Sequence, residues 1–355
     1  MEYNMKNITT TDATVNSSKN GALESKIFQL VKMKYDLQKL RIATGNRLCA
    51  SFNIQLGQQP STPQQDMPDE SQKLLKKLTA EYDRITDAMI ENKASVNKVI
   101  KELSEELDWV RSKLDYDLIS EYVSLLEVEK RNIASMKKLV REHPLYDAFF
   151  NTEQCKGIGE ETAAACIALF DVYKARHAAS FWKYAGLNPV QRVNKDGKVV
   201  TEGNSKKYTE EFEYTDPKTG EVKTKRGITY NPELKTILLG VTANNIIKCC
   251  IRVEKDENKK PTGIVTYYGY AVQYRDYKNR KKQQHPDWSD GHIHNVAKRW
   301  MIRNFVRDLW VAWRTIEGLP VTVPYEQEFL GKAPHKWPNL VVYNENQANI
   351  IREEY

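Results

Sequence analysis

Residues 154–168 read Gln-Cys-Lys-Gly-Ile-Gly-Glu-Glu-Thr-Ala-Ala-Ala-Cys-Ile-Ala and decide the fold of the second half of the chain. A glycine-containing turn between a helix and an alanine-rich second helix predicts a helix-hairpin-helix. Glycine permits left-handed or tight backbone geometry, so such a turn can approach another backbone closely. The first amides of the second helix lack intrahelical partners and can bind an anion, typically a nucleic-acid phosphate. The predicted phosphate contacts are Lys156, Gly157, Ile158, Gly159, Glu160 and Thr162. The alternative is a tight helix–helix turn without a ligand.

Composition bounds the class of protein. A chain of 355 residues is long enough for two or three domains. The five cysteines are odd in number and lack C-x-x-C spacing, which indicates a reducing compartment without disulfides or a zinc ribbon. No run approaches the ~18 apolar residues of a membrane span, and the polar N-terminus is not a signal peptide. The sequence therefore predicts a cytoplasmic protein that does not enter a membrane, and it indicates neither a metal site nor a cofactor.

The basic excess lies entirely in the second half. Residues 1–150 hold 22 Lys+Arg and 22 Asp+Glu, whereas the whole chain has a net charge of +7. Such asymmetry favours an anionic polymer as partner, although a basic helix can also be a solvated face. Arg299 and Arg303 are four residues apart on a predicted helix, so they share a face and can contact adjacent phosphates.

Glycine, proline and changes in composition divide the chain into five segments, of which 69–144 is described in the next paragraph. Residues 1–22 are rich in Asn, Thr and Ser and are predicted to be disordered. Residues 23–68 hold a helix over about 24–48 and a proline-rich linker. Residues 145–317 carry the helix-hairpin-helix domain, and 318–355 form a loosely structured tail.

Residues 69–144 are predicted to be a coiled coil or a helical hairpin. Apolar residues recur there at spacings of three and four, and no Gly or Pro occurs between Asp69 and His143. A single helix and a folded-back pair with a turn near Asp115–Asp117 remain alternatives. A coiled coil would make the protein a homo-oligomer, whereas a helix pair would pack on its own domain.

A small β-insertion is predicted at 190–230. Alternating Val, Tyr and Phe flank Asp196-Gly197 and Thr219-Gly220, which are hairpin-turn signals. A helix from Pro232 to about Val253 follows, then a Tyr-rich helix from Tyr267 to about Gln284, and a basic helix from Gly291 to about Glu317. The tyrosines of the second helix fit either a platform for stacking bases or a core stripe.

Several motifs occur in an order that resembles the C-terminal domain of the IS-one-ten (DEDD-type) insertion-sequence transposases, which are guided by a bridge RNA. The runs that carry the resemblance are Gly157-Ile-Gly159, Phe181-Trp-Lys-Tyr-Ala-Gly-Leu-Asn-Pro189, Leu234-Lys-Thr-Ile-Leu-Leu239 and His292-Ile-His-Asn-Val-Ala-Lys-Arg-Trp-Met-Ile-Arg303. The resemblance covers about 145–315. It implies DNA transposition or recombination, with DNA and a structured guide RNA as partners.

The chain departs from that family at two points. The first 145 residues lack the β/α rhythm of the family's ribonuclease-H-like domain, and with it the carboxylates of a two-metal site. Where the family places a catalytic serine, this chain has Asn194 and Lys195. Ser205 is the nearby hydroxyl with basic neighbours and becomes the candidate nucleophile; the alternative is a turn residue in a solvent loop. The basic candidates around it for DNA contact are Lys198, Lys206 and Lys207.

The sequence thus predicts a mainly α protein. Its N-terminal half is helical or coiled-coil, and a helix-hairpin-helix DNA-binding domain with a small β-hairpin insertion follows. The leading functional hypothesis is a transposase-related DNA-binding protein. The alternative is a catalytically inactive, repurposed relative that binds nucleic acid or a protein partner.

Overall fold

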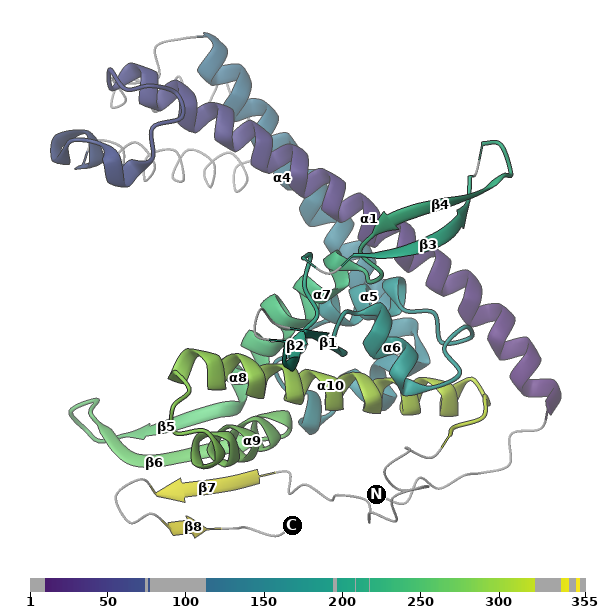
Figure 1. The fold of residues 1–355 in the computed structure, drawn as a ribbon. Helices are drawn as coiled ribbons and strands as arrows, with labels where there is room; N and C mark the ends of the chain where they lie inside the picture. Colours follow the sequence, from purple (N-terminus) through teal and green to yellow (C-terminus); the bar gives the residue numbers. More distant parts are fainter. Residues whose placement is uncertain are drawn as a thin grey trace. The chain divides into compact units, whose positions relative to one another are not determined.

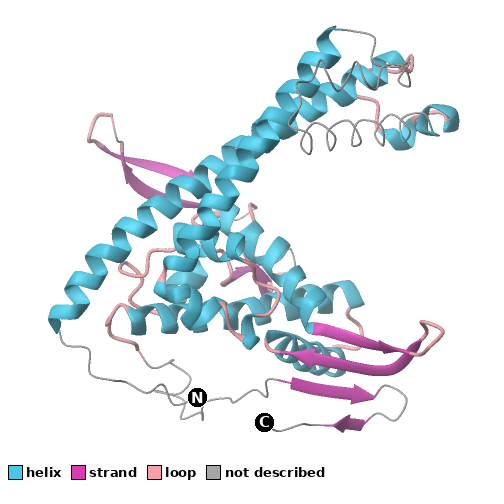
Figure 2. Cartoon of the chain, turned by 180° about the vertical axis from the view of Figure 1, so that it is seen from behind, coloured by secondary structure: helices cyan, strands magenta, loops and turns pink. Residues whose placement is uncertain are grey.

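The computed structural model describes residues 10–73, 76, 113–193, 197–207, 209–216, 218–322, 340–344 and 349–351. These residues are mainly helical, and their strands form short antiparallel sheets (Figure 2). The chain divides into two compact units, one made of residues 29–138 and one of residues 1–28 and 139–355. Residues 74, 75 and 77–112, half of the predicted coiled coil or helical hairpin at 69–144, lie outside the described residues.

The unit of residues 29–138 is built on two antiparallel helices. They are parts of α1 (Thr10–Gln55) and α4 (Lys113–Glu142), and a short 3-10 turn, η1, covers Gln64–Asp66. The Arg41 guanidinium donates to Glu129 at 2.6 Å and to the Tyr122 hydroxyl at 3.1 Å, so partly buried polar contacts join the two helices. α4 is continuous from Lys113, which excludes the turn predicted near Asp115–Asp117.

The first helix is longer than the sequence predicts. α1 begins at Thr10, inside the segment expected to be disordered, and ends at Gln55 rather than near residue 48. Its Asn, Thr and Ser residues have low helix propensity, but propensity is a weak prior that helical context overrides.

The other unit is mainly helical, and its longest helix is α10. The helical elements are η2 (Tyr146–Phe150, a π-helix), η3 (Glu153–Cys155, a 3-10 helix), α5 (Glu160–Leu169), α6 (Ala178–Tyr184), α7 (Pro232–Thr236), η4 (Ile237–Thr242, a π-helix), α8 (Ala243–Cys250), α9 (Tyr270–Gln284) and α10 (Asp290–Ile316). Gly186, with φ +63°, lies two residues after the end of α6, where a left-handed glycine commonly ends a helix.

The helix-hairpin-helix prediction is only partly reproduced. α5 follows the glycine turn as expected, but the segment before the turn is the single 3-10 turn η3 rather than an α-helix. Thr152, an extended residue, separates η3 from the helical segment that ends at Phe150.

The core of this unit surrounds α10. Trp310, Trp313 and Phe305 are almost fully buried, and Phe181 of α6 stacks on Phe170 with ring centroids 4.0 Å apart. α9 lies alongside α10 (Figure 1), where Asn304 donates to Gln273 at 2.7 Å and Tyr270 donates to Asp308 at 3.0 Å. Burying these large apolar side chains supplies most of the driving force for folding the unit.

The predicted β-insertion consists of two separate hairpins. β1 (Pro189–Val193) pairs with β2 (Val199–Gly203), and β3 (Glu210–Thr215) pairs with β4 (Val222–Gly227). The two predicted turn glycines, Gly197 and Gly220, have positive φ.

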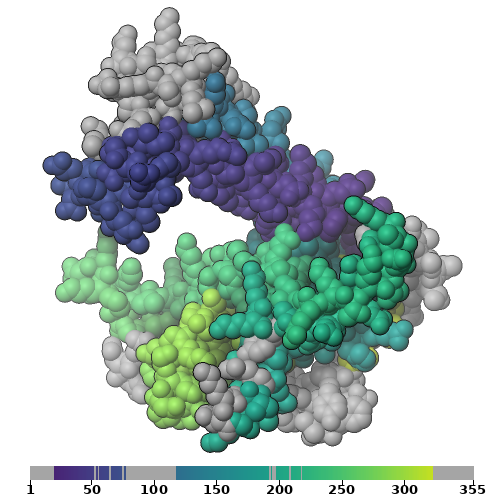
Figure 3. All heavy atoms as spheres, turned by 45° about the horizontal axis from the view of Figure 1, so that its top comes forward, coloured from purple at the N-terminus to yellow at the C-terminus, as the bar shows by residue number. Residues whose placement is uncertain are grey.

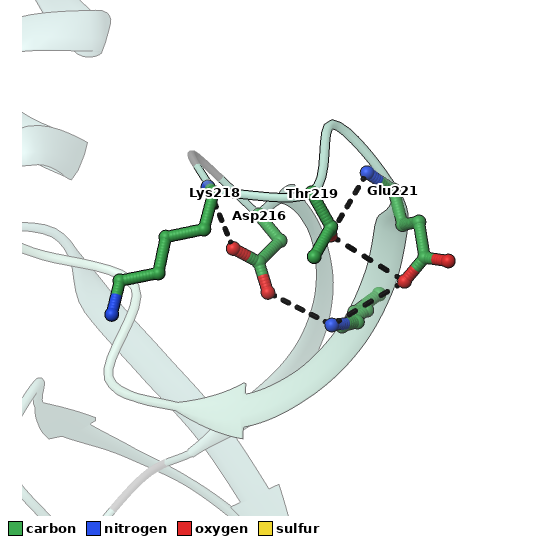
Figure 4. A network of polar contacts seen from close by, with 5 residues as sticks. Asp216, Lys218, Thr219 and Glu221 are labelled. Carbon is green, nitrogen blue, oxygen red and sulfur yellow. Dashed lines mark hydrogen bonds and ion pairs between the residues drawn. The ribbon is translucent and has the colours of Figure 1, made fainter.

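The turn of the second hairpin is held by a polar network (Figure 4). The Asp216 carboxylate accepts from the Lys218 amide at 2.9 Å and from the Lys223 ammonium at 2.8 Å. Lys223 also lies 3.5 Å from the Glu221 carboxylate. The hydrogen bond from Lys223 is the main reason that the pKa of Asp216 is lowered.

A four-stranded antiparallel sheet was not predicted. It has the order β5-β6-β7-β8, with β5 (Ile251–Lys255), β6 (Pro261–Tyr268), β7 (Leu340–Asn344) and β8 (Asn349–Ile351). Tyr267 therefore lies in a strand rather than at the start of a helix, because β-branched residues favour extended backbone and Gly269 breaks the strand with φ +50°. The tail, predicted to be loosely structured, contributes β7 and β8.

Candidate nucleic-acid interface

The glycine turn makes its close backbone approach inside the protein. Gly157 has φ +89°, and a Cβ at this position would lie 2.8 Å from the Asn245 carbonyl oxygen and 2.9 Å from the Cys249 Cβ. The Cys250 thiol donates to the Lys156 carbonyl at 2.9 Å, and Ile158 is buried. The packing of this turn on α8 thus accounts for Gly157 and Ile158 without a ligand.

The amino end of α5 carries acidic side chains. Gly159 is its N-cap residue, has open space where a Cβ would lie, and provides no side-chain cap. Glu160 and Glu161 occupy the first turn, and Glu160 is bridged to Arg141 with Nε 3.1 Å from its carboxylate. Thr162 is buried. Acidic residues stabilise a helix N-terminus, but they disfavour a phosphate at the same place.

A second cluster lies where β2 ends, and it includes the candidate serine loop. The Arg299 guanidinium of α10 occupies the space directly over Gly203, where a Cβ would coincide with it. The Lys235 ammonium of α7 donates to the carbonyl of Asn204, which is buried, and lies 4.6 Å from the centre of the Tyr230 ring. We refer to these two cations and residues 203–205 as the Lys235–Arg299 site.

The electrostatics of this site are unusual because neither cation has a carboxylate partner within the described ranges. Burial, and then the charge of Arg299, lower the pKa of Lys235 to about 8. Burial likewise lowers the pKa of Arg299, whose buried Nε has no hydrogen-bond partner within the described part of the chain. No carboxylate among the described residues forms an ion pair with either cation. Two desolvated like charges disfavour each other, so an anion bound between them would be stabilised by both.

The predicted basic residues lie at different distances from this site. Ser205, Lys206 and Lys207 directly follow Asn204, and both lysines are exposed. Lys198 lies at the opposite end of the β1–β2 hairpin, because Val193 pairs with Val199 at the turn and Pro189 with Gly203 at the base. At ~3.3 Å per residue, Lys198 is roughly 15 Å from Gly203.

Arg303 extends the site along α10. Its guanidinium lies 4.5 Å from the centre of the Trp182 ring, and the Trp182 indole donates to the Arg303 carbonyl at 2.9 Å. In the space-filling view, the yellow-green surface near residue 300 lies beside the teal surface near residue 200 (Figure 3). The structure thus places Arg299 against Gly203, just before Ser205, Lys206 and Lys207 in the chain, whereas Gly157 of the predicted turn packs on α8.

No family model, curated protein or solved structure matches the chain. Its candidate function therefore rests on the geometry of the site.

Three further findings concern metal ions, membrane spans and cysteines. Within the described ranges, no three His, Cys, Asp or Glu side chains gather closely enough to hold a metal ion. None of the described helices combines the length and apolar character that crossing a bilayer requires. All five cysteines carry free thiols.

Lys235 and Trp182 are the residues that sequence reasoning missed. Both lie inside runs that carry the family resemblance, Leu234–Leu239 and Phe181–Pro189. Lys235 follows an N-cap, Asn231, whose side chain accepts from the Leu234 amide at 3.0 Å, and a lysine in a short capped helix resembles an ordinary solvated residue. Its proximity to Arg299 is a tertiary contact that no local pattern encodes.

Proposed function

We propose that this chain binds the phosphate backbone of nucleic acid at the Lys235–Arg299 site, and that it acts in DNA transposition or recombination as a transposase-related DNA-binding protein. The observation that carries the phosphate-binding part of the proposal is the pair of partly buried cations without a carboxylate partner among the described residues. The role in transposition or recombination is supported by the order of the sequence motifs over about 145–315. Phosphate is the anion that Arg and Lys side chains bind jointly in nucleic-acid interfaces.

The surroundings favour a polyanion over a small anion. Lys206 and Lys207 are exposed next to the site, and Arg303 lies one helical turn beyond Arg299. Several phosphates of one backbone can therefore be contacted together. The proposal places the main phosphate contact here rather than at α5, whose amino end is acidic.

Binding to duplex DNA, branched DNA and structured RNA across a salt series tests the proposal. We expect Lys235→Met and Arg299→Met each to weaken binding about tenfold and to reduce the slope of log affinity against log salt by about 1. Gly203→Ala keeps every charge but leaves no room for the guanidinium in its present position, so it is expected to weaken binding as well.

Lys255→Met is the matched control, because it removes an exposed cation at the end of β5, a strand that contributes no residue to the site. It is expected to change affinity less than twofold. If the site variants retain wild-type affinity and salt slope while remaining folded by circular dichroism, the proposed phosphate site is wrong.

The affinity is also expected to depend on pH through Lys235. In the free protein the pKa of Lys235 is about 8, and a bound phosphate stabilises the charged amine and raises that pKa. Binding therefore takes up a proton above pH 8, so affinity falls as pH rises from about 8 and is constant between pH 6 and 7. The fall should approach tenfold per pH unit and should disappear in Lys235→Met, as measured by fluorescence anisotropy.

A second candidate function, strand transfer with Ser205 as nucleophile, is favoured by the same lysine. An amine with a pKa near 8 is partly neutral at physiological pH and can accept a hydroxyl proton. The serine oxygen would form a bond to phosphorus while the bond from phosphorus to a deoxyribose oxygen breaks. Lys235 would take up the serine proton, and the departing deoxyribose oxygen would take a proton from water. Strand cleavage that Ser205→Ala abolishes without loss of binding would support this activity; equal cleavage by that variant would exclude Ser205.

A further inference from the structure

The carboxyl-terminal half of α9 carries a concentration of positive charge. Four cations lie within five residues, and no Asp or Glu occurs from Tyr277 to Pro286. The amino-terminal half of the same helix is buried, with Tyr270 and Tyr274 in the core, and the helix then emerges from it. The cations are Lys278, Arg280, Lys281 and Lys282.

Two of these cations, Arg280 and Lys281, lie over a stacked pair of aromatic rings, while the Lys278 ammonium lies 5.8 Å from the centre of the Tyr274 ring. Tyr277 stacks on Trp300 of α10 with centroids 4.7 Å apart and planes 14° from parallel, and both residues are half-buried. The Arg280 guanidinium lies 4.9 Å and the Lys281 ammonium 5.6 Å from the centre of the Tyr277 ring. This surface therefore places positively charged side chains next to the faces of aromatic rings.

Stabilisation of α9 explains only some of these cations and does not explain Trp300. Basic residues in the last turn interact favourably with the helix dipole, which explains Lys281 and Lys282. Among the described residues, the carboxylate that pairs with this group is Asp290, 3.4 Å from Lys282, and no carboxylate there forms an ion pair with Lys278 or Arg280. The Trp300 indole nitrogen is buried and lacks a hydrogen-bond partner in the described part of the chain, which costs free energy that a phenylalanine would not.

We propose that this surface, formed by Tyr277, Lys278, Arg280, Lys281 and Trp300, binds unpaired nucleotides of a nucleic acid. Bases stack on the aromatic pair, and Arg280 and Lys281 move from the tyrosine ring to the flanking phosphates. Stacking on aromatic side chains within a cationic groove is how proteins hold single strands, whereas the bases of a duplex already stack on one another. The inference rests on the proposed function for the class of partner, but it uses different residues.

Oligonucleotides with and without bases test this role. The probes are 12-mers of deoxythymidine and of uridine, an abasic 12-mer with the same phosphates, and a duplex of equal length. We expect the wild-type protein to bind both base-carrying single strands more tightly than the abasic one. Tyr277→Leu should lose about tenfold on the base-carrying strands and less than twofold on the abasic strand and the duplex.

If Tyr277→Leu unfolds, Arg280→Gln and Trp300→Phe still test the proposal, with Lys218→Gln as the control. Arg280→Gln changes an exposed side chain and should weaken binding of every single strand, whereas Lys218→Gln, in the β3–β4 turn, should not. Trp300→Phe should remove the quenching of tryptophan fluorescence that the thymidine 12-mer causes in the wild type. Equal binding of abasic and base-carrying strands by the wild-type protein would overturn the proposal.

The same probes separate this inference from the Lys235–Arg299 site. Arg299→Met is expected to weaken binding of all probes, because it removes a phosphate contact. If Arg299→Met binds normally while Tyr277→Leu loses the base-carrying strands, the proposed phosphate site fails and the stacking surface stands. The reverse result overturns the stacking surface alone.

Discussion

Replacing Gly157 by alanine is expected to lower the free energy of unfolding by about 2–4 kcal/mol. The new Cβ would meet the Asn245 carbonyl oxygen at 2.8 Å, and this neighbour is backbone of α8 that cannot move like the end of a side chain. The φ of +89° adds strain for any residue with a Cβ. Left-handed backbone costs about 1–2 kcal/mol, and overpacking a tight contact costs about 1–3 kcal/mol.

Gly159→Ala provides a matched control two residues away. No atom lies within 4 Å of the position of its Cβ, and its φ of −84° suits any residue. Because alanine is a poorer N-cap than glycine, a loss of up to about 1 kcal/mol is expected. Urea unfolding followed by circular dichroism measures both variants. Equal stability of the two would show that the turn does not pack on α8 as described.

Gly157→Ala and Gly159→Ala together also distinguish loss of nucleic-acid binding by unfolding from loss of a phosphate contact at the turn. If Gly157→Ala binds weakly, unfolding explains the result as well as a lost phosphate contact does. Gly159→Ala changes the open amino end of α5 without disturbing α8, so it is the variant that reports on a phosphate there. With Glu160 and Glu161 at that end, we expect its affinity to remain within twofold of wild type.

The features that could be predicted from sequence are those encoded within a few residues. Gly197 and Gly220 mark hairpin turns because only glycine adopts positive φ at little cost. Gly186 ends α6 for the same reason. α10 follows its apolar period, and its predicted bounds lie within one residue of Asp290–Ile316.

The features that escaped prediction depend on distant partners. Tyr267 and Tyr268 were assigned to a helix on local pattern, but their strand pairs with β5 and with β7 from the chain's tail. Gly157 signalled a close approach correctly, while its partner, α8, could not be read from the turn.

The candidate site likewise combines residues that the local sequence indicates with contacts that depend on distant partners. Ser205, Lys206, Lys207 and Arg299 stood out by residue type, yet nothing local indicated that Arg299 lies over Gly203. Lys235 was missed because its unusual environment arises from burial and from Arg299, which is remote in sequence. A partly buried cation without a carboxylate partner can be identified only from the three-dimensional structure.

Arg314→Met is expected to destabilise the protein by about 3 kcal/mol or more. The buried guanidinium holds a loop by donating to three backbone carbonyls, those of Pro320 at 2.6 Å and of Val172 and Ala175 at 3.0 Å each. Hydrogen bonds from a charged donor contribute about 1.5–3 kcal/mol each, and they are not additive within one side chain. Methionine fills similar space but leaves the carbonyls of Val172 and Pro320 without this donor.

Two comparisons separate the hydrogen bonds from packing. Arg314→Lys keeps the charge but not the planar fork that reaches carbonyls on both sides, so it should lie between wild type and Arg314→Met. Thr315→Ala alters the next, exposed residue of α10 and is expected to change stability by less than about 0.5 kcal/mol. If Arg314→Met unfolds at the same urea concentration as Thr315→Ala, the guanidinium does not hold the loop. The indole of Trp310, which donates to the Ala175 carbonyl at 2.8 Å, would then secure that loop without it.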